Sequence, residues 1–305
     1  MSIAKIPQRK SAFRRALSDG RVATVLLFLP PALMLFSFFV IWPLIEAASY
    51  SGYKWSGYGQ PSDWVGTRNF EILANHSVFH QSLWNTVKII LVSALVQVPL
   101  ALTLALLIYR KNWSNTLFRL IFFAPFILAE IATGLIWSFV FDGDYGIAAM
   151  AAETFDTAAV YPLSDRFWAF PVIMFVVVWK FFGFHMMIFI AALQGIPEDL
   201  TEAARIDGAK PGQIAWHIKV PLLRPAIIVS LFFAVIGSLQ LFDLIVPLTN
   251  GGPSNTTHTI VSYLYTFGLV RLKVGFGAAV GIVLFIMCVG FAIAYRSTFM
   301  REDRS

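Results

Sequence analysis

Three ionisable residues lie within long apolar stretches of the sequence: Glu130, Lys180 and Asp243. A charge in hydrocarbon costs about 2.5 to 3.5 kcal/mol on insertion scales unless it is paired or faces water, so such residues point to function. We expect Glu130 and Lys180 near the middle of two membrane spans and Asp243 toward the outer end of a third. Two interpretations stay open: a structural ion pair between Glu130 and Lys180, or side chains that line a path for a polar solute.

Aromatic and hydrogen-bonding side chains accompany these charges in the same stretches. They suit a sugar, because the C–H face of a sugar ring stacks on aromatic rings while its hydroxyls need donors and acceptors. Beside the path we expect Trp137, Trp179, Phe182, Gln240 and Asn250.

Motifs for catalysis are missing from the sequence. No Gly-Lys dipeptide occurs, which excludes a Walker A phosphate loop, so the chain itself is not an ATPase. The histidines are scattered, and no Cys/His cluster has the spacing of metal ligands. We therefore expect no catalytic residue, no metal and no cofactor in this chain.

The composition indicates an integral membrane protein, since 58% of the 305 residues are hydrophobic and only 13% are charged. Six apolar stretches are long enough to span a bilayer, which predicts an all-α fold with six transmembrane helices. The predicted spans are residues 22–45, 86–109, 117–141, 167–193, 225–248 and 276–295.

The distribution of charge predicts the orientation of these helices. The net charge of +6 comes from basic residues in loops and tails rather than in one stripe, so nucleic acid is not an expected partner. The loop 142–166 is instead acidic, with Arg166 as its only basic residue. We expect that loop outside, and both the basic tail 1–21 and the tail 296–305 in the cytoplasm, around a membrane domain of residues 22–295.

The polar segment 194–225 is the longest connection on the cytoplasmic side. A short amphipathic helix is predicted from Glu198 to Asp207, Gly208 supplies a helix stop, and a second short helix follows before Pro221. Small residues on a polar helix allow close approach of a partner, and charges fix its register. The residues that would couple the chain to a partner are Glu202, Ala203, Ala204, Arg205, Asp207, Gly208 and Pro221.

This segment resembles the cytoplasmic EAA loop in the permease subunits of bacterial ABC importers. The resemblance rests on Glu202-Ala203-Ala204, on Gly208 after three further residues, and on Ile218 with Val220-Pro221; the family has Leu-Pro where this chain has Val220-Pro221. Two flanking sequence segments, ALQGIP at 192–197 and LTNGGP at 248–253, are similar to those of the carbohydrate-uptake branch, which includes the maltose and glycerol-3-phosphate permeases.

The resemblance implies a bacterial inner-membrane permease subunit that moves a sugar or sugar-like solute. Its expected partners are a second homologous permease, two ATPase subunits that bind ATP and Mg, and an external solute-binding protein. It also implies that Glu202 meets a basic residue of the ATPase, and that the spans with Trp179-Lys180 and Phe242-Asp243 line the path. The alternative is an ion-coupled secondary transporter, for which Glu130 and Asp243 would be the relevant residues.

Overall fold

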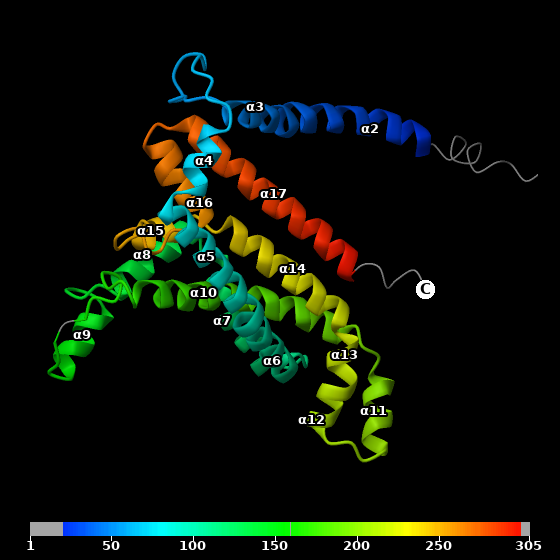
Figure 1. Cartoon of the computed structure of the whole chain (residues 1–305). Helices are drawn as coiled ribbons and strands as arrows, with labels where there is room; N and C mark the ends of the chain where they lie inside the picture. The colour runs from blue at the N-terminus through cyan, green and yellow to red at the C-terminus, as the bar shows by residue number, and fades with distance from the viewer. Residues whose placement is uncertain (1–20, 159, 300–305) are drawn as a thin grey trace, which may run out of the picture.

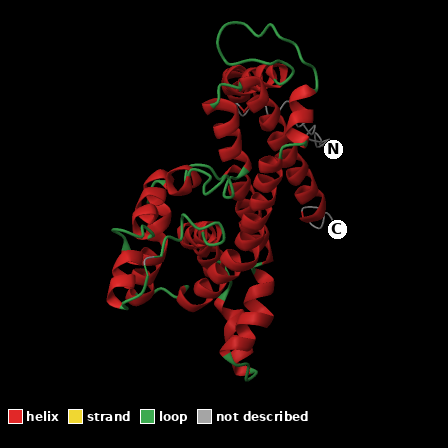
Figure 2. Ribbon diagram, turned by 60° about the vertical axis from the view of Figure 1, so that its left-hand side comes forward, coloured by secondary structure: helices red, strands yellow, loops and turns green. Residues whose placement is uncertain are grey.

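The computed structural model describes residues 21–158 and 160–299, and in this part of the chain helices are joined by loops (Figure 2). Within the same residues, Tyr53 and Trp64 form an isolated antiparallel β-bridge. Among the described residues, four helices are long and apolar enough to cross a membrane, or up to six if each of two sharply bent helix pairs is one span. The all-helical membrane fold is thus confirmed. Apart from Arg21 and residues 296–299, the two predicted tails lie outside the described residues.

The first span projects away from the other helices (Figure 1). It consists of α2 (Arg21–Phe36), a π-helical segment (Ser37–Ile41) and α3 (Trp42–Tyr50), and α3 packs against α17 (Val274–Phe299). None of its most apolar 18 residues is buried. An apolar helix exposed on all sides needs lipid or another chain around it.

Helix α10 (Ala169–Gln194) forms the centre of the fold. It packs against the second span, a continuous helix built from α5 (Ser77–Val92), the π-helical segment η2 (Ser93–Gln97) and α6 (Val98–Ile108). Buried residues lie on every face of α10. One hydrophobic cluster surrounds its N-terminal half and another its C-terminal half. This helix therefore fixes the positions of its neighbours.

The predicted third span, residues 117–141, is not one helix. Helix α7 (Trp113–Ile127) and helix α8 (Glu130–Val140) meet at an angle of 97°. Leu128 and Ala129 between them are extended, with ψ of 142° and 141°. Glu130 is therefore the first residue of a new helix at the break, rather than an interior residue of one continuous helix.

The predicted fifth span, residues 225–248, is also interrupted. Helix α14 (Arg224–Gln240) ends eight residues early, and Asp243 lies in the turn before the short helix α15 (Ile245–Thr249). Helix α8 packs against α15, where a Cβ on Gly134 would lie only 2.9 Å from the carbonyl oxygen of Leu244. The two interrupted spans thus meet at their breaks.

The loop 250–259 is held to the second span by hydrogen bonds. Asn85 Nδ2 donates to the carbonyls of Thr256 at 2.7 Å and His258 at 3.0 Å. Gly251, at φ +78°, lies against the His258 ring, and no side chain would fit there. After this loop come α16 (Ile260–Tyr263), the π-helical segment η4 (Leu264–Val270) and α17.

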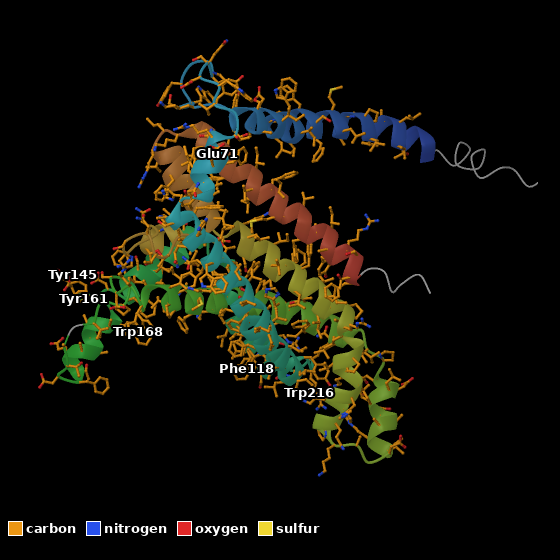
Figure 3. All side chains as sticks on the ribbon, viewed as in Figure 1. Glu71, Phe118, Tyr145, Tyr161, Trp168 and Trp216 are labelled. Carbon is orange, nitrogen blue, oxygen red and sulfur yellow. The ribbon has the colours of Figure 1, made fainter. Side chains whose placement is uncertain are left out.

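Short helices outside the spans include α4 (Arg68–Ala74), α9 (Ile147–Thr154) and α11 (Glu198–Ile206). Helix α9 belongs to the acidic loop 142–166, in which the Tyr161 hydroxyl donates to Asp144 at 2.7 Å (Figure 3). Helix α11 belongs to the predicted coupling segment and lies at the opposite end of α10 (Figure 1).

Candidate functional site

The segment that resembles the EAA loop folds as predicted into a short helix with a glycine stop. Gly208 has φ +85°, its N–H bonds the Arg205 carbonyl at 3.0 Å, and Ala209 N–H bonds the Ala204 carbonyl at 2.9 Å. This pair of bonds is the Schellman arrangement, which satisfies the last carbonyls of a helix. The left-handed conformation strongly favours glycine at this position.

Helix α11 is largely uncovered. Glu202, Ala203, Arg205 and Asp207 are exposed, and Ile206 is 86% exposed. Ala204 is half-buried. An exposed face that combines small, apolar and charged side chains is suited to a protein partner.

The second short helix of the segment is continuous with a membrane span. Helices α12 (Pro211–Ile214) and α13 (Val220–Leu222), joined by a π-helical segment (Ala215–Lys219), bend by 68° into α14. Pro221 is the second residue of α13 and directly follows the π-helical segment and Val220. Trp216 on the same segment is exposed (Figure 3).

A cavity of about 460 Å³ separates α11 from the end of α6, and charged side chains of both signs line it. Lys219 Nζ donates to the Tyr109 hydroxyl and lies 4.0 Å from the centre of its ring. Burial acts to raise the pKa of Tyr109, but hydrogen bonds from Lys219 and Arg110 outweigh it and lower the pKa. Lys219 thus ties the coupling segment to the second span, a contact that no sequence pattern indicated.

Lys180 lies at the break of the third span. Its Nζ donates to the carbonyls of Pro125 at 3.1 Å and Phe126 at 3.2 Å, and also to that of Leu128. These are the carbonyls that the end of α7 leaves without partners. An ammonium group has three N–H donors, and all three are used here.

Of the two interpretations of Glu130 and Lys180, the direct ion pair is not found in the described part of the chain, where Lys180 donates to backbone carbonyls instead. Lys180 attracts the Glu130 carboxylate electrostatically without a direct bond, and the negative charge of Asp243 repels it. Because the third span is broken, it leaves backbone carbonyls that a continuous helix would have paired. Lys180 donates to these carbonyls and not to the Glu130 carboxylate. Glu130 and Asp243 come from the two interrupted spans that meet here.

The predicted aromatic residues form packing contacts. Trp137 and Trp179 meet edge to face with ring centres 5.1 Å apart. Phe182 is buried and packs edge to face on Phe122 at 5.8 Å. Asn250 is an exposed left-handed residue, at φ 48°, that ends α15. None of these four lines the cavity described next, and their place on the solute path stays a prediction.

A cavity of about 370 Å³ lies between η2, α7, α10 and α14. Of the predicted residues, Gln240 lines it. Four aromatic rings contribute, from Phe126, Phe181, Phe184 and Phe233. The other polar lining residues are Ser93, Gln97, His185 and Ser238.

Those four polar residues were not predicted as lining residues because they are uncharged. A signal was present: Ser93 and Gln97 lie four residues apart in an apolar run, which is helical spacing. The π-helical segment η2 contains both, and such segments occur often at functional sites. No group of three His, Cys, Asp or Glu side chains in the described ranges could hold a metal ion.

Comparison with known proteins identifies relatives along nearly the whole chain. Residues 97–298 match the family described as binding-protein-dependent transport system inner membrane component. The sulfoquinovosyl glycerol transport system permease protein SmoG of Agrobacterium fabrum is 31% identical over 95% of this chain and 94% of its own length. The diacetylchitobiose uptake system permease protein NgcF of Streptomyces coelicolor is 31% identical over 92% of this chain and 83% of its length. The lactose transport system permease protein LacF of Rhizobium radiobacter is 33% identical over 86% of this chain and 89% of its own length.

A solved structure shares the fold. A chain from the crystal structure of a bacterial ABC transporter that imports the acidic polysaccharide alginate superposes with a TM-score of 0.81 at 22% identity, over 95% of this chain and 99% of that one. From the family match and these relatives, the chain belongs to the inner membrane permease components of binding-protein-dependent ABC transport systems.

Proposed function

We propose that this chain is the permease subunit of a bacterial importer that carries a sugar or sugar-like solute across the inner membrane. The main support for a coupling role is that helix α11 is exposed, ends in a glycine stop and is followed by a helical segment that leads directly into α14. The cavity with aromatic and polar lining supports a saccharide as the solute. The names of the relatives, which include lactose and diacetylchitobiose, support the same class.

The chain works with other subunits in this proposal. Two ATPase subunits, which bind ATP and Mg, dock on α11, and an external binding protein delivers the solute. A second homologous permease packs on this one, and the uncovered first span is the surface that favours it. The basic tails lie in the cytoplasm with α11, and the acidic loop 142–166 lies outside.

Motion passes from the ATPase to the solute cavity along one stretch of backbone. Closure of the ATPase dimer moves α11 with its binding cleft. The α12–α13 segment follows and moves α14 through the bend at Leu223. Because Gln240 and Ser238 stand on α14, the cavity changes access from one side of the membrane to the other.

A substitution on α11 tests this coupling. Glu202→Ala removes the carboxylate expected to meet a basic residue of the ATPase, and we expect ATP-driven uptake in reconstituted vesicles to fall at least tenfold. Unchanged uptake would refute the coupling role. Uptake that continues without ATPase subunits and stops with the ion gradient would favour the secondary transporter.

A matched pair of glycines separates the helix stop from general damage. A Cβ on either Gly208 or Gly212 meets nothing within 4 Å, but only Gly208 has a positive φ. Gly208→Val should therefore impair stimulation of the ATPase, whereas Gly212→Val should leave it near normal. Equal behaviour of the two variants would contradict the Schellman stop as the important feature.

A further inference from the structure

We propose that the cavity between η2, α7, α10 and α14 binds an uncharged glycosyl unit, and that this chain disfavours acidic sugars. This inference rests on the proposed function, and it specifies the class of substrate for that same cavity. The relatives do not decide the class, because permeases named for sulfoquinovosyl glycerol and for diacetylchitobiose are equally similar, at 31% identity.

The first argument is the charge of the lining. The cavity is lined by 15 residues, and none of them is Lys, Arg, Asp or Glu. An anion brought into a low-dielectric site without a countercharge is strongly destabilised. A neutral solute meets no such penalty.

The second argument is that the nearby cation is already used. Lys180 is 2% exposed, and its three N–H donors are taken by the carbonyls of Pro125, Phe126 and Leu128. An acidic substrate could recruit this ammonium only by freeing the carbonyls at the end of α7. The only other charges that we have placed at the break, Glu130 and Asp243, are negative.

The third argument is that the polar groups lining the cavity are uncharged and can hydrogen-bond the hydroxyls of a solute. Gln97 is 2% exposed, and its Oε1 accepts from Ser93 at 3.4 Å, while its Nε2 donates to no group in the described part of the chain. His185 is 3% exposed, and its Nδ1 bonds the Ser230 hydroxyl at 2.7 Å, which leaves Nε2 for a ligand. Both residues line the cavity, so a hydroxyl of a solute there could accept from the Gln97 amide and bond the free His185 ring nitrogen.

The fourth argument is the aromatic part of the lining. Phe126 and Phe184 stack with ring centres 4.8 Å apart, and Phe184 meets Phe233 edge to face at 5.7 Å. These rings offer the C–H face of a sugar a surface while Gln97, His185 and Ser238 meet its hydroxyls. Phe233 and Gln240 are exposed, so the second permease would close the cavity on that side.

The test uses the complete transporter in vesicles, with both permeases, the ATPase subunits and the binding protein. Lactose and diacetylchitobiose serve as neutral probes, and glycerol 3-phosphate and a glucuronic-acid disaccharide as acidic probes. Import is measured first. The imported probe is then used to protect a cysteine at Gly237→Cys from maleimide, in a Cys288→Ser background that removes the single native cysteine. Gly237 lines the cavity, and a Cβ there meets nothing within 4 Å.

A second glycine provides the control reporter. A Cβ on Gly290 of α17 also meets nothing within 4 Å, and Gly290 lies outside the cavity. We expect a neutral probe to be imported and to slow labelling at position 237 several-fold, with no effect at position 290. Import of an acidic probe would overturn the proposal, and so would a neutral probe that is imported without protecting position 237. If no saccharide is imported, the proposed function itself fails.

A substitution in the lining gives an independent measurement. Gln97→Leu removes the free amide, and the concentration of imported neutral probe that half-protects position 237 should rise about tenfold, which corresponds to one hydrogen bond. Thr103→Val is the matched control, since Thr103 is a polar, exposed residue of the same span that bonds only the Pro99 carbonyl. Equal half-protection in Gln97→Leu and Thr103→Val would overturn the role of Gln97.

Discussion

The first span and the fourth span are almost equally apolar, yet they stand in opposite environments. Residues Thr24–Tyr50 reach a mean hydropathy of 2.3 and Ala169–Gln194 reach 2.1. None of the most apolar window is buried in the first span, whereas 56% is buried in the fourth. Hydropathy predicts that a helix enters the membrane, and it does not predict what the helix packs against.

The residues that distinguish the two helices are few. Helix α10 contains Gly183 at a close backbone contact, together with the buried polar residues Lys180 and His185. Small residues allow helices in membranes to approach, and polar residues hold them together. Substitutions in the two helices should therefore differ greatly in effect, and the predictions below test this difference.

The largest effect is expected at Gly183. A Cβ there would lie 2.1 Å from the backbone oxygen of Phe122, so α7 would have to move. Gly183→Val should destabilise the chain by more than about 4 kcal/mol, measured as the midpoint of SDS-induced unfolding in mixed micelles. Gly290→Val, which meets nothing within 4 Å, is the control. If both variants unfolded at the same midpoint, the close contact of α7 and α10 would be in error.

The next effect is expected at Lys180. Lys180→Met leaves the α7 carbonyls without charged donors and should destabilise by about 3 kcal/mol in the same assay. Since Lys180 and Glu130 attract each other without a direct bond, adding Glu130→Gln should give little rescue, and the double-mutant coupling should be small compared with the loss in Lys180→Met. Recovery of stability in the double variant would instead indicate a direct ion pair between Lys180 and Glu130.

The smallest effect is expected in the first span. Phe28 is 67% exposed, so Phe28→Ala should change the unfolding midpoint of the separate chain by no more than about 0.5 kcal/mol. In the proposed complex, the same substitution should weaken association with the second permease, measured by co-purification. A large loss of stability in the separate chain would mean that this helix packs on its own subunit.

The positions of the spans could be predicted because each needs a long apolar run. The breaks at Leu128–Ala129 and at Leu241 could not, since those residues are apolar and their extended conformation is open to any type of residue. Lys180 was identified as important, but its partners are backbone carbonyls, which no sequence pattern displays. Gly208 was predicted correctly as a helix stop because a left-handed residue at the end of a helix is usually glycine, which the sequence shows directly. Gln97 and His185 were missed because an uncharged polar residue in an apolar run costs too little to stand out.

The interrupted third span also constrains how the chain is made. Pro125 is separated from Lys180 by 55 residues of sequence, so its carbonyl has no donor when α7 leaves the ribosome. Unpaired backbone groups in hydrocarbon cost several kcal/mol, and a lone ammonium is comparably unfavourable. Each segment alone would thus resist release into lipid, whereas the two together are satisfied. We expect the translocon to retain α7 and α8 until α10 has been synthesised and then to release the three as one unit.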